Sequence, residues 1–446
     1  MDLDAIFKAY DVRGVVPGEL DEEAARRIGY AFARFAGADR IVVGRDARTS
    51  SPVLAVGVGD GIRAAGVGVR DLGMITTDMV YFASGHYDLP GAMITASHNP
   101  KGYNGIKLCL AGAAPVGVDS GLTEVRTLAA DDPPSDLVGA HRADDVLDAY
   151  VDHMLRAAGA ISISGLKVAV DGGNGVAGVA IPSIFDRIDA DLIGLYLDPD
   201  GTFPNHHPDP LRPENLIDLT ALIARESPDL GVAFDGDADR AFFIDDAGDP
   251  LSGSTVTAML AKWFLAEDSG ANIVHNLICS KAVPETITAA GGAPVRTRVG
   301  HSYIKQVMKE TGAVFGGEHS GHYYFRDNFR ADSGILATLI LMRILSESES
   351  PLSELRRDFE PYAQSGEINM IVADTAVEID RVAAVFKDGD CLDGITVELG
   401  DTWFNLRPSN TESVLRLNVE APDPKAVEKL VAEVRSHIQE VDDGAS

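Results

Sequence analysis

The feature that most constrains the fold of this chain is a strand–helix–strand pattern that occurs three times. The apolar runs at 40–46, 167–173 and 272–281 each predict a buried strand, and each is followed by a helix-forming stretch and a second apolar run. Strands that alternate with helices are typical of a mostly parallel sheet. We therefore expect three related α/β domains, which share a pattern of residue types rather than identical letters.

Polar segments rich in breaker residues indicate the seams between these domains. They are found at 129–136, at 245–253 and, after a short helix that begins in 346–355, at 361–370. In the final stretch, PDPKAVEKLV, Pro424 precedes apolar residues at three- and four-residue spacing, which predicts a C-terminal helix. A chain of 446 residues has room for several cores of this kind.

Charge and cysteine usage disfavour several classes of protein. The chain has 38 basic and 68 acidic residues, a net charge of −30, and no basic run, so we expect it to bind neither nucleic acid nor a membrane. Its 3 separated cysteines indicate neither a disulfide framework nor a zinc site, and they are typical of a reducing cytoplasm. The N-terminus lacks a signal-peptide pattern. The apolar segment 334–345 is too short to cross a bilayer, which predicts a buried core helix in a cytoplasmic protein.

The sequence TASHNP at 95–100 directly follows the apolar run PGAMI, which indicates a strand that ends in a polar loop. Loops at strand ends carry much of the chemistry of α/β proteins. Ser97 is therefore a candidate nucleophile. Serine, asparagine and proline also favour ordinary turns, so these residues alone leave both interpretations open.

A second motif, DGDADR, lies between the apolar runs LGVAF and AFFI. Asp235, Asp237 and Asp239 alternate on a tight turn, so their carboxylates can converge, and such a cluster is costly without a cation. Oxygen ligands of this kind suit Mg²⁺. An EF-hand loop would need glycine and glutamate where this chain has Arg240 and Asp246, and a solvated acidic hairpin would not explain the arginine.

The glycines of DGGNGVAG, residues 171–178, form the GxGxxG pattern of dinucleotide-binding sites. Asp171 and Gly172 separate this pattern from the preceding strand. We therefore expect a tight strand-to-helix turn here rather than a nicotinamide or flavin site.

The stretch FGGEHSGHYYF has the composition of a sugar-binding loop. Glu318 and Ser320 would point the same way if the segment is extended, and a carboxylate beside a hydroxyl suits sugar hydroxyls. His301 and His322 are candidates for proton transfer, although a single histidine is more often structural.

The stretch NLRPSNTESVLRL gathers hydrogen-bond donors before a strand. Arg407, Ser409, Asn410 and Thr411 have the composition of a phosphate cradle, or else of a polar turn that bonds to itself. Basic residues gathered at these stretches would let so acidic a chain hold an anion. Those that lie within or beside the polar stretches are Arg13, Lys107, Arg240, Lys281 and Arg407.

Together these motifs resemble the α-D-phosphohexomutase superfamily, and most of all its phosphomannomutase/phosphoglucomutase branch. TASHNP, DGDADR, GEHSGH and RPSNT occur in the family's order, and IFKAYDVRG and HNPKGYNGIK are also similar to it. The resemblance implies three related α/β mixed-sheet domains plus a smaller C-terminal α+β domain around a central cleft. The implied domains and loops are 1–150 (phosphoserine), 151–250 (metal), 251–362 (sugar) and 363–446 (phosphate).

The resemblance also implies residue roles. Ser97 would carry a phosphoryl group as phosphoserine, and Mg²⁺ would bind this phosphate and the three aspartates of DGDADR. Arg240 would spread the developing charge, and His98 and Lys107 would fix the phosphoserine loop. The candidates for proton transfer, none of them assigned as the general base, are Arg13, Lys107, His301 and His322. The implied substrate-binding residues are Tyr10, Lys281, Glu318, Ser320, Arg407, Ser409, Asn410 and Thr411.

The implied reaction interconverts hexose 1-phosphate and hexose 6-phosphate. Phospho-Ser97 would transfer its phosphate to give a hexose 1,6-bisphosphate, which reverses its orientation in the cleft. The same bisphosphate would also serve as the activator. Mannose is the first expected substrate and glucose the second. His319 replaces the glutamine typical of phosphoglucosamine mutases, which argues against glucosamine phosphate without excluding it. A monomer or a homodimer is expected.

Three other classes remain open from the sequence. A haloacid-dehalogenase-type phosphatase would form an aspartyl phosphate on the DxD of FDGDAD and leave Ser97 in a turn. A non-catalytic sugar-phosphate sensor would bind without turnover, and a dinucleotide oxidoreductase would bind a nicotinamide cofactor.

Overall fold

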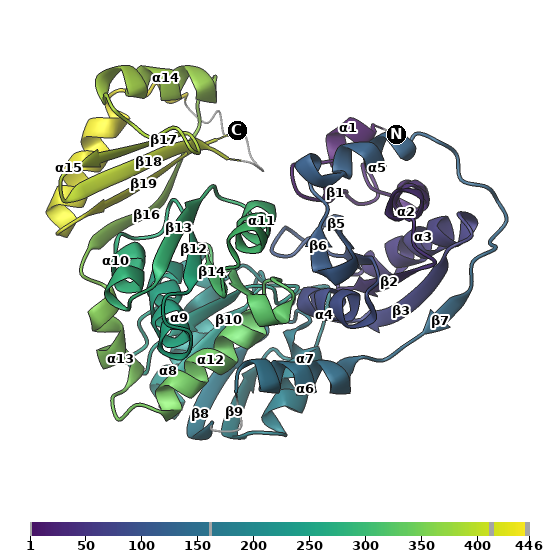
Figure 1. The fold of residues 1–446 in the computed structure, drawn as a ribbon, viewed down its shortest axis with the longest axis horizontal. Coiled ribbons are helices and arrows are strands. Elements are labelled where there is room, and N and C mark those ends of the chain that lie inside the picture. Colours follow the sequence, from purple (N-terminus) through teal and green to yellow (C-terminus); the bar gives the residue numbers. More distant parts are fainter. Residues whose placement is uncertain (1, 160–162, 410–413, 442–446) are drawn as a thin grey trace.

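The computed structural model describes residues 2–159, 163–409 and 414–441. Its strands form four sheets, which define four units (Figure 1). Units I, II and III have mixed sheets flanked by helices, and unit IV has an antiparallel sheet with two helices, so the predicted fold class is confirmed. Among the described residues, no helix is long and apolar enough to cross a membrane.

Unit I contains the first polar motif, in the connection between β4 and β5. Its sheet has the order β1-β5-β4-β2-β3-β7, with β6 paired to β5. The strands are β1 (Val12–Val15), β2 (Arg40–Arg45), β3 (Gly68–Met74), β4 (Gly91–Ile94), β5 (Tyr103–Leu110), β6 (Ala114–Pro115) and β7 (His141–Ala143). The helices are α1 (Leu3–Ile6), α2 (Glu22–Ala36), α3 (Ser51–Ala64), α4 (Thr77–Tyr87) and α5 (Leu122–Leu128).

Units II and III contain the next two motifs. Unit II comprises α6 (Leu147–Ala157), β8 (Ser164–Asp171), α7 (Ala177–Phe185), β9 (Asp189–Leu195), α8 (Ile217–Glu226), β10 (Leu230–Phe234) and β11 (Ala241–Ile244). Unit III comprises α9 (Gly253–Glu267), β12 (Asn272–Asn276), α10 (Ala282–Ala289), β13 (Ala293–Thr297), α11 (His301–Thr311), β14 (Phe315–Gly317), β15 (Tyr323–Phe325) and α12 (Gly334–Ser346).

The first three units share one topology, as the repeated pattern predicts. In each, three parallel strands are joined by a fourth that returns antiparallel: β3-β2-β4-β5, β9-β8-β10-β11 and β13-β12-β14-β15. Each of the first three polar motifs lies in the connection between the third and fourth strand of its unit. This connection starts at the carboxyl end of a parallel strand, which is where α/β sheets commonly build their sites.

Unit IV follows α13 (Leu352–Leu355) and contains the fourth motif. Its sheet has the order β16-β19-β18-β17, and it has its own apolar core. The elements are β16 (Ala363–Met370), α14 (Thr375–Val385), β17 (Ile395–Leu399), β18 (Thr402–Pro408), β19 (Leu415–Ala421) and α15 (Pro424–Arg435), the last being the predicted C-terminal helix.

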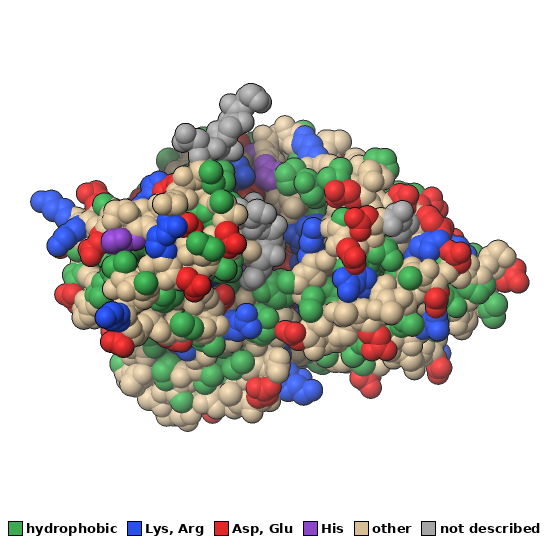
Figure 2. All heavy atoms as spheres, turned by 90° about the horizontal axis from the view of Figure 1, so that it is seen from above, with side chains coloured by type: hydrophobic (Ala, Val, Ile, Leu, Met, Phe, Trp, Pro, Cys, Tyr) green, Lys and Arg blue, Asp and Glu red, His purple; other side chains and the backbone are tan. Residues whose placement is uncertain are grey.

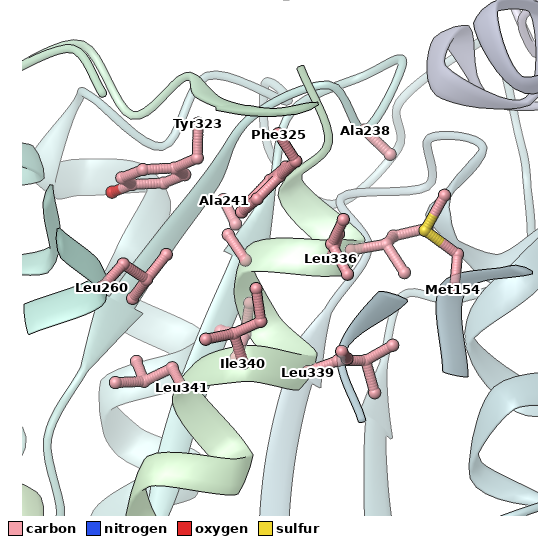
Figure 3. Close-up of a cluster of buried hydrophobic side chains, with 14 of the residues drawn as sticks. Met154, Ala238, Ala241, Leu260, Tyr323, Phe325, Leu336, Leu339, Ile340 and Leu341 are labelled. Atoms are coloured by element: carbon pink, nitrogen blue, oxygen red, sulfur yellow. The ribbon is translucent and has the colours of Figure 1, made fainter. Parts of the chain in front are cut away.

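The apolar segment 334–345 forms the buried helix α12, as predicted. Its side chains point into a cluster shared with Met154 of unit II and Tyr323 of unit III (Figure 3). The same cluster continues to Met93 of unit I. Units I to III therefore share a continuous core, whereas the core of unit IV is separate.

Asp78, in α4 of unit I, is a buried polar residue that forms hydrogen bonds to units II and III. Its Oδ2 accepts hydrogen bonds from Tyr150 Oη of unit II at 2.5 Å and from Ser333 Oγ of unit III at 2.6 Å. Its other oxygen accepts one from Thr76. The side chain is fully buried, and burial raises the pKa of the Asp78 carboxyl to about 6.

This raised pKa predicts a pH-dependent contribution to stability. Between about pH 4 and pH 6 the folded state holds a proton that the unfolded state has lost, so stability falls as pH rises through this window. The Asp78→Asn variant has no carboxyl here, so its stability should not show this fall with pH. The free energy of unfolding of the variant minus that of the unsubstituted protein should therefore rise by up to about 3 kcal/mol between pH 4 and pH 7. Unfolding monitored by calorimetry measures the difference, with Asp148→Asn, at an exposed aspartate, as the control. A constant difference from pH 4 to pH 7 would contradict the prediction.

Candidate active site

Ser97 lies in the connection between β4 and β5 and faces the second motif. Its hydroxyl donates to Asp235 Oδ2 at 2.6 Å and lies 3.1 Å from His98 Nδ1. Arg240 Nη2 donates to the same hydroxyl at 3.4 Å. Ser97 is buried and has φ +51°, a left-handed conformation that costs a non-glycine residue about 1 kcal/mol or more. Strained backbone of this kind is often retained at functional sites.

The three aspartates of the second motif converge on one point. Asp235, Asp237 and Asp239 lie in the turn between β10 and β11, are all buried, and offer carboxylate oxygens within 4.8 Å of one another. Asp237 Oδ1 and Asp239 Oδ1 are buried and accept no hydrogen bond from the described residues. Buried oxygens are rarely left unpaired, and oxygen ligands suit Mg²⁺, so this cluster fits a divalent cation.

Two cations offset part of the negative charge of this cluster. Arg240 Nη2 lies 2.9 Å from Asp235 Oδ2, yet burial outweighs this arginine and raises the pKa of Asp235 to about 7. Lys107 Nζ lies 2.9 Å from Asp237 Oδ2 and also pairs with Asp239. Burial opposes the charge of Lys107, but these two carboxylates raise its pKa well above the ordinary value, so it stays an ammonium.

Of the two candidate histidines, His322 lies beside this cluster. His322 Nε2 is 3.8 Å from Asp239 Oδ1, and backbone pairing between Arg240 and His322 joins the two motifs. His301 begins α11, and burial, with the charge of Lys305, lowers its pKa to about 3. His98 is also held neutral, because burial lowers its pKa well below the ordinary value.

Glu318 and Ser320 do not point the same way, because the segment between β14 and β15 is a turn rather than extended chain. Gly321 in this turn has φ +85°. The Glu318 carboxylate faces the interior and accepts a hydrogen bond from Tyr324 Oη at 2.6 Å and from the Gly300 amide at 3.2 Å. Ser320 Oγ instead lies 3.1 Å from His322 Nδ1.

Two further predicted residues, Arg13 and Tyr10, belong to unit I and contact segments around the site. Arg13 Nη1 donates to Asn99 Oδ1 at 2.6 Å, so it contacts the loop of Ser97 rather than Ser97 itself. Tyr10 Oη donates to the carbonyl oxygen of Val299 at 3.2 Å, and its ring meets that of His301 edge-on.

The remaining residues predicted to bind substrate belong to unit IV or lie beside it. Arg407 is buried and donates to Glu367 Oε2 at 2.7 Å, and burial lowers its pKa. The amide of Ser409 donates to the Val414 carbonyl at 2.9 Å. Lys281 Nζ of unit III donates to the Gly400 carbonyl at 3.2 Å. Asn410 and Thr411 lie outside the described residues.

The structure thus brings three of the four motifs together. No hydrogen bond or ion pair that it gives for residues 2–159, 163–409 and 414–441 links Arg407 to the other three motifs. Seen from above, acidic and basic side chains are interspersed over units I and IV (Figure 2). That face shows no continuous basic area among the residues drawn in colour.

Several polar residues that the sequence motifs did not indicate support the site. Thr77, at the start of α4, donates from Oγ1 to Asp237 Oδ2 at 2.7 Å and from its amide to the Asp237 carbonyl at 3.0 Å. Arg48 and His207 contact the Ser97 loop from beneath. Arg48 has one sequence signal, because it follows the predicted strand 40–46 at its carboxyl end.

The glycine-rich segment at 171–178 is the predicted turn between β8 and α7. Its glycines allow close backbone packing. A Cβ on Gly178 would lie 1.7 Å from the Leu197 carbonyl oxygen, and one on Gly175 would lie 2.7 Å from that of Gly236. The space that a dinucleotide phosphate would approach is therefore occupied by the chain itself.

Comparisons with known proteins agree with this arrangement over almost the whole chain. Models for the phosphoglucomutase/phosphomannomutase alpha/beta/alpha domains I, II and III match residues 4–131, 148–248 and 252–362, and the model for the C-terminal domain matches 367–437.

Individual relatives match at similar length. The chain is 41% identical to a phosphomannomutase of Salmonella montevideo and 40% identical to one of Escherichia coli K12, in each case over 93% of this chain and 94% of the relative. A crystal structure of a phosphoglucomutase/phosphomannomutase family protein from Burkholderia thailandensis superposes with a TM-score of 0.89 at 34% identity, covering 99% of this chain and 98% of that one.

Proposed function

Because the chain belongs to the phosphoglucomutase/phosphomannomutase family, we propose that it interconverts hexose 1-phosphate and hexose 6-phosphate through a phosphoserine at Ser97. It is a mutase, an isomerase-type phosphotransferase. Mannose phosphate is the proposed first substrate and glucose phosphate the second, because relatives about 40% identical over nearly the whole chain are phosphomannomutases.

The observation that supports this proposal most directly is the position of the Ser97 hydroxyl. It lies 2.6 Å from a carboxylate of the aspartate cluster and within 3.4 Å of Arg240. A phosphoryl group on this oxygen would lie between a cation site and a guanidinium. Phosphoryl transfer is accelerated mainly by positioning and by stabilising charge on the equatorial oxygens, and this pair of groups does both.

Asp235, Asp237, Asp239 and the phosphate on Ser97 would hold Mg²⁺ in this proposal. When bound, the ion would supply positive charge to the phosphoryl oxygens. Lys107 holds Asp237 and Asp239 in place from the other side, and Arg240 orients Asp235. The buried unpaired oxygens of Asp237 and Asp239 are the reason to expect a cation here.

The remaining residues would bind and orient the sugar phosphate. Glu318 and Ser320 are the proposed contacts to the sugar hydroxyls, and Tyr10 and Lys281 would line the approach of the substrate. Arg407, Ser409, Asn410 and Thr411 would hold the phosphate that is not being transferred. Since Arg407 donates to Glu367 in this conformation, phosphate binding would replace or share that contact.

Proton transfer to and from the sugar hydroxyl is assigned to a set of candidates rather than to one residue. Of the two histidine candidates, His322 lies beside the aspartate cluster, with Nε2 at 3.8 Å from Asp239 Oδ1. Burial lowers the pKa of His301 to about 3, so it is neutral at pH 7 and only a weak general base there. Lys107 stays charged between two carboxylates, and Arg13 acts on the loop through Asn99.

The same proposal includes a cytoplasmic enzyme, active as a monomer or homodimer, with hexose 1,6-bisphosphate as activator. The alternatives are not favoured: the relatives match over the full length of a mutase, and a haloacid-dehalogenase-type phosphatase would leave the strained Ser97 without a role. Glucosamine phosphate remains a poorer candidate because His319 replaces the glutamine typical of phosphoglucosamine mutases. His319 Nδ1 lies 2.9 Å from Ser254 Oγ.

The test is a set of initial rates on mannose 1-phosphate, glucose 1-phosphate and glucosamine 1-phosphate, with Mg²⁺ and a trace of the matching 1,6-bisphosphate. We expect the 6-phosphates of mannose and glucose, with mannose fastest. A phosphoenzyme stable to hydroxylamine would agree with a serine ester, whereas a labile one would indicate an aspartyl phosphate. No turnover of any of the three sugars would overturn the proposed function.

A further inference from the structure

Arg48 is a fully buried arginine directly beneath the Ser97 loop. It follows β2 in unit I and is 1% exposed. A guanidinium has five N–H donors and a fixed charge, so burying it is costly unless those donors are used. Where its donors point therefore indicates what this side chain does.

Its two terminal nitrogens both donate to the backbone of the Ser97 loop. Nη2 donates to the carbonyl oxygens of Ser97 and Asn99, each at 2.7 Å. Nη1 donates to those of Pro100 at 2.9 Å and Tyr103 at 3.0 Å. Nε lies 3.2 Å from Asp46 Oδ2, an ion pair whose geometry does not make a hydrogen bond.

Unit II completes the same support. His207 Nε2 donates to the carbonyl oxygen of His98 at 2.6 Å, the loop carbonyl that Arg48 does not reach. The Phe203 ring centre lies 5.4 Å from the Arg48 guanidinium carbon. Gly201 pairs with the Arg48 backbone, where a Cβ would lie 2.1 Å from the Ala47 carbonyl oxygen.

The glycine-rich turn of unit II anchors this support. Asn174 Nδ2 donates to the Asp198 carbonyl at 2.9 Å, and Asn205 donates to Asn174 Oδ1 at 2.8 Å. These contacts fasten the segment that contains Gly201, Phe203 and His207 to the end of β8. The motif that resembles a dinucleotide fingerprint thus has a role in supporting the Ser97 loop.

The carbonyl oxygens of residues 97 to 100 are consequently all fixed by Arg48 or His207. Peptide groups are planar, so fixing successive carbonyls fixes the dihedral angles between them. Ser97 is the residue whose φ of +51° needs such constraint. A lysine has no fork with which to bond several carbonyls at once.

We propose that Arg48, assisted by His207, is a positioning residue for phosphoryl transfer. It touches no reacting atom and acts through the backbone, by holding the Ser97 oxygen between Asp235 and Arg240. This inference rests on the proposed role of Ser97 as the phosphoryl carrier.

The test compares Arg48→Lys with Arg356→Lys. Arg356 is a matched control, because it also bonds backbone carbonyls, those of Asp249 and Pro250, and a buried carboxylate, but away from the Ser97 loop. We expect Arg48→Lys to lower kcat for mannose 1-phosphate by about 10²-fold, the scale of a misplaced reacting group, with KM changed less than about threefold. Phosphorylation of Ser97 by the 1,6-bisphosphate should slow by the same factor. The control should keep its kcat.

Hydrogen–deuterium exchange of the peptide 95–104 provides a readout that does not depend on turnover. Faster exchange is expected in Arg48→Lys and unchanged exchange in Arg356→Lys. If the unsubstituted protein turns over no hexose phosphate but the exchange result holds, the proposed function fails while the support of the loop stands. Unchanged kcat per folded molecule in Arg48→Lys, or an equal fall in the control, would overturn the proposal.

His207→Leu keeps the proposal falsifiable if Arg48→Lys does not fold. It removes one donor from a partly exposed side chain and should lower kcat by about tenfold, again with little change in KM. A normal kcat in His207→Leu together with unchanged exchange of peptide 95–104 would refute the inference.

Discussion

Substituting alanine for Ser97 is expected to lower kcat for mannose 1-phosphate by at least about 10⁴-fold, because the phosphoryl carrier is lost. Among the described residues, the carboxylate beside the Ser97 hydroxyl, that of Asp235, is already paired with Arg240. Incubation with hexose 1,6-bisphosphate should add one phosphate to the unsubstituted protein and none to the variant. Intact mass measurement detects this difference directly.

Ser84→Ala is a suitable control for that experiment. Ser84 is buried in the same unit and donates to the carbonyl oxygens of Leu89 and Leu110, at 2.7 and 3.1 Å, without contacting the site. Its loss should reduce stability by about 1 kcal/mol and leave kcat per folded molecule unchanged. Full activity in Ser97→Ala would mean that TASHNP is an ordinary turn and that another residue carries the phosphate.

Asp237→Asn is expected to lower kcat by about 10³-fold, equivalent to roughly 4 kcal/mol in the barrier, and to abolish Mg²⁺ binding at millimolar concentration. Asp237 is the most informative of the three aspartates. Its Oδ1 points into the cluster without a hydrogen bond from the described residues, while Asp235 also contacts Ser97 and Asp239 also faces His322. An asparagine removes the charge and presents an amide to Lys107.

Metal dependence provides the second arm of this prediction. Treatment of the unsubstituted protein with EDTA should remove its activity, and Mg²⁺ should restore it, while Asp237→Asn should respond to neither. Calorimetric titration with Mg²⁺ measures binding independently of turnover. Asp245→Asn is the control and should still bind the ion. Asp245 is also a buried aspartate of unit II, but it pairs with Arg356 at 2.8 Å. Activity that survives EDTA would contradict a catalytic metal.

The sequence predicted the parts of the site that are local in the chain. Asp235, Asp237 and Asp239 alternate within five residues, so one turn suffices to bring them together. Ser97 follows a recognisable strand, and the repeated strand–helix–strand pattern correctly indicated three related sheets. These features depend on neighbouring residues, to which sequence patterns are sensitive.

The parts that sequence did not predict depend on contacts between distant segments. Thr77 reaches Asp237 across 160 positions, and His207 reaches His98 across 109. The direction of Glu318 depends on whether its segment turns or extends, and the alternating pattern fits both. The pairing of Arg407 with Glu367 depends on a register between β16 and its neighbours that no local pattern specifies.

The start of α4 has a mechanical consequence for the whole catalytic cycle. Its first residues bind the aspartate turn through Thr77 and units II and III through Asp78, so we expect units I to III to move as one body. Any opening that lets the bisphosphate intermediate reverse its orientation would then come from a movement of unit IV, whose core is separate. The serine, the aspartates and the histidines would keep fixed mutual distances throughout. Each end of the sugar would therefore reach a reaction centre of the same geometry. The reaction would be reversible because units I to III keep that geometry, without any coordinated movement of all four units.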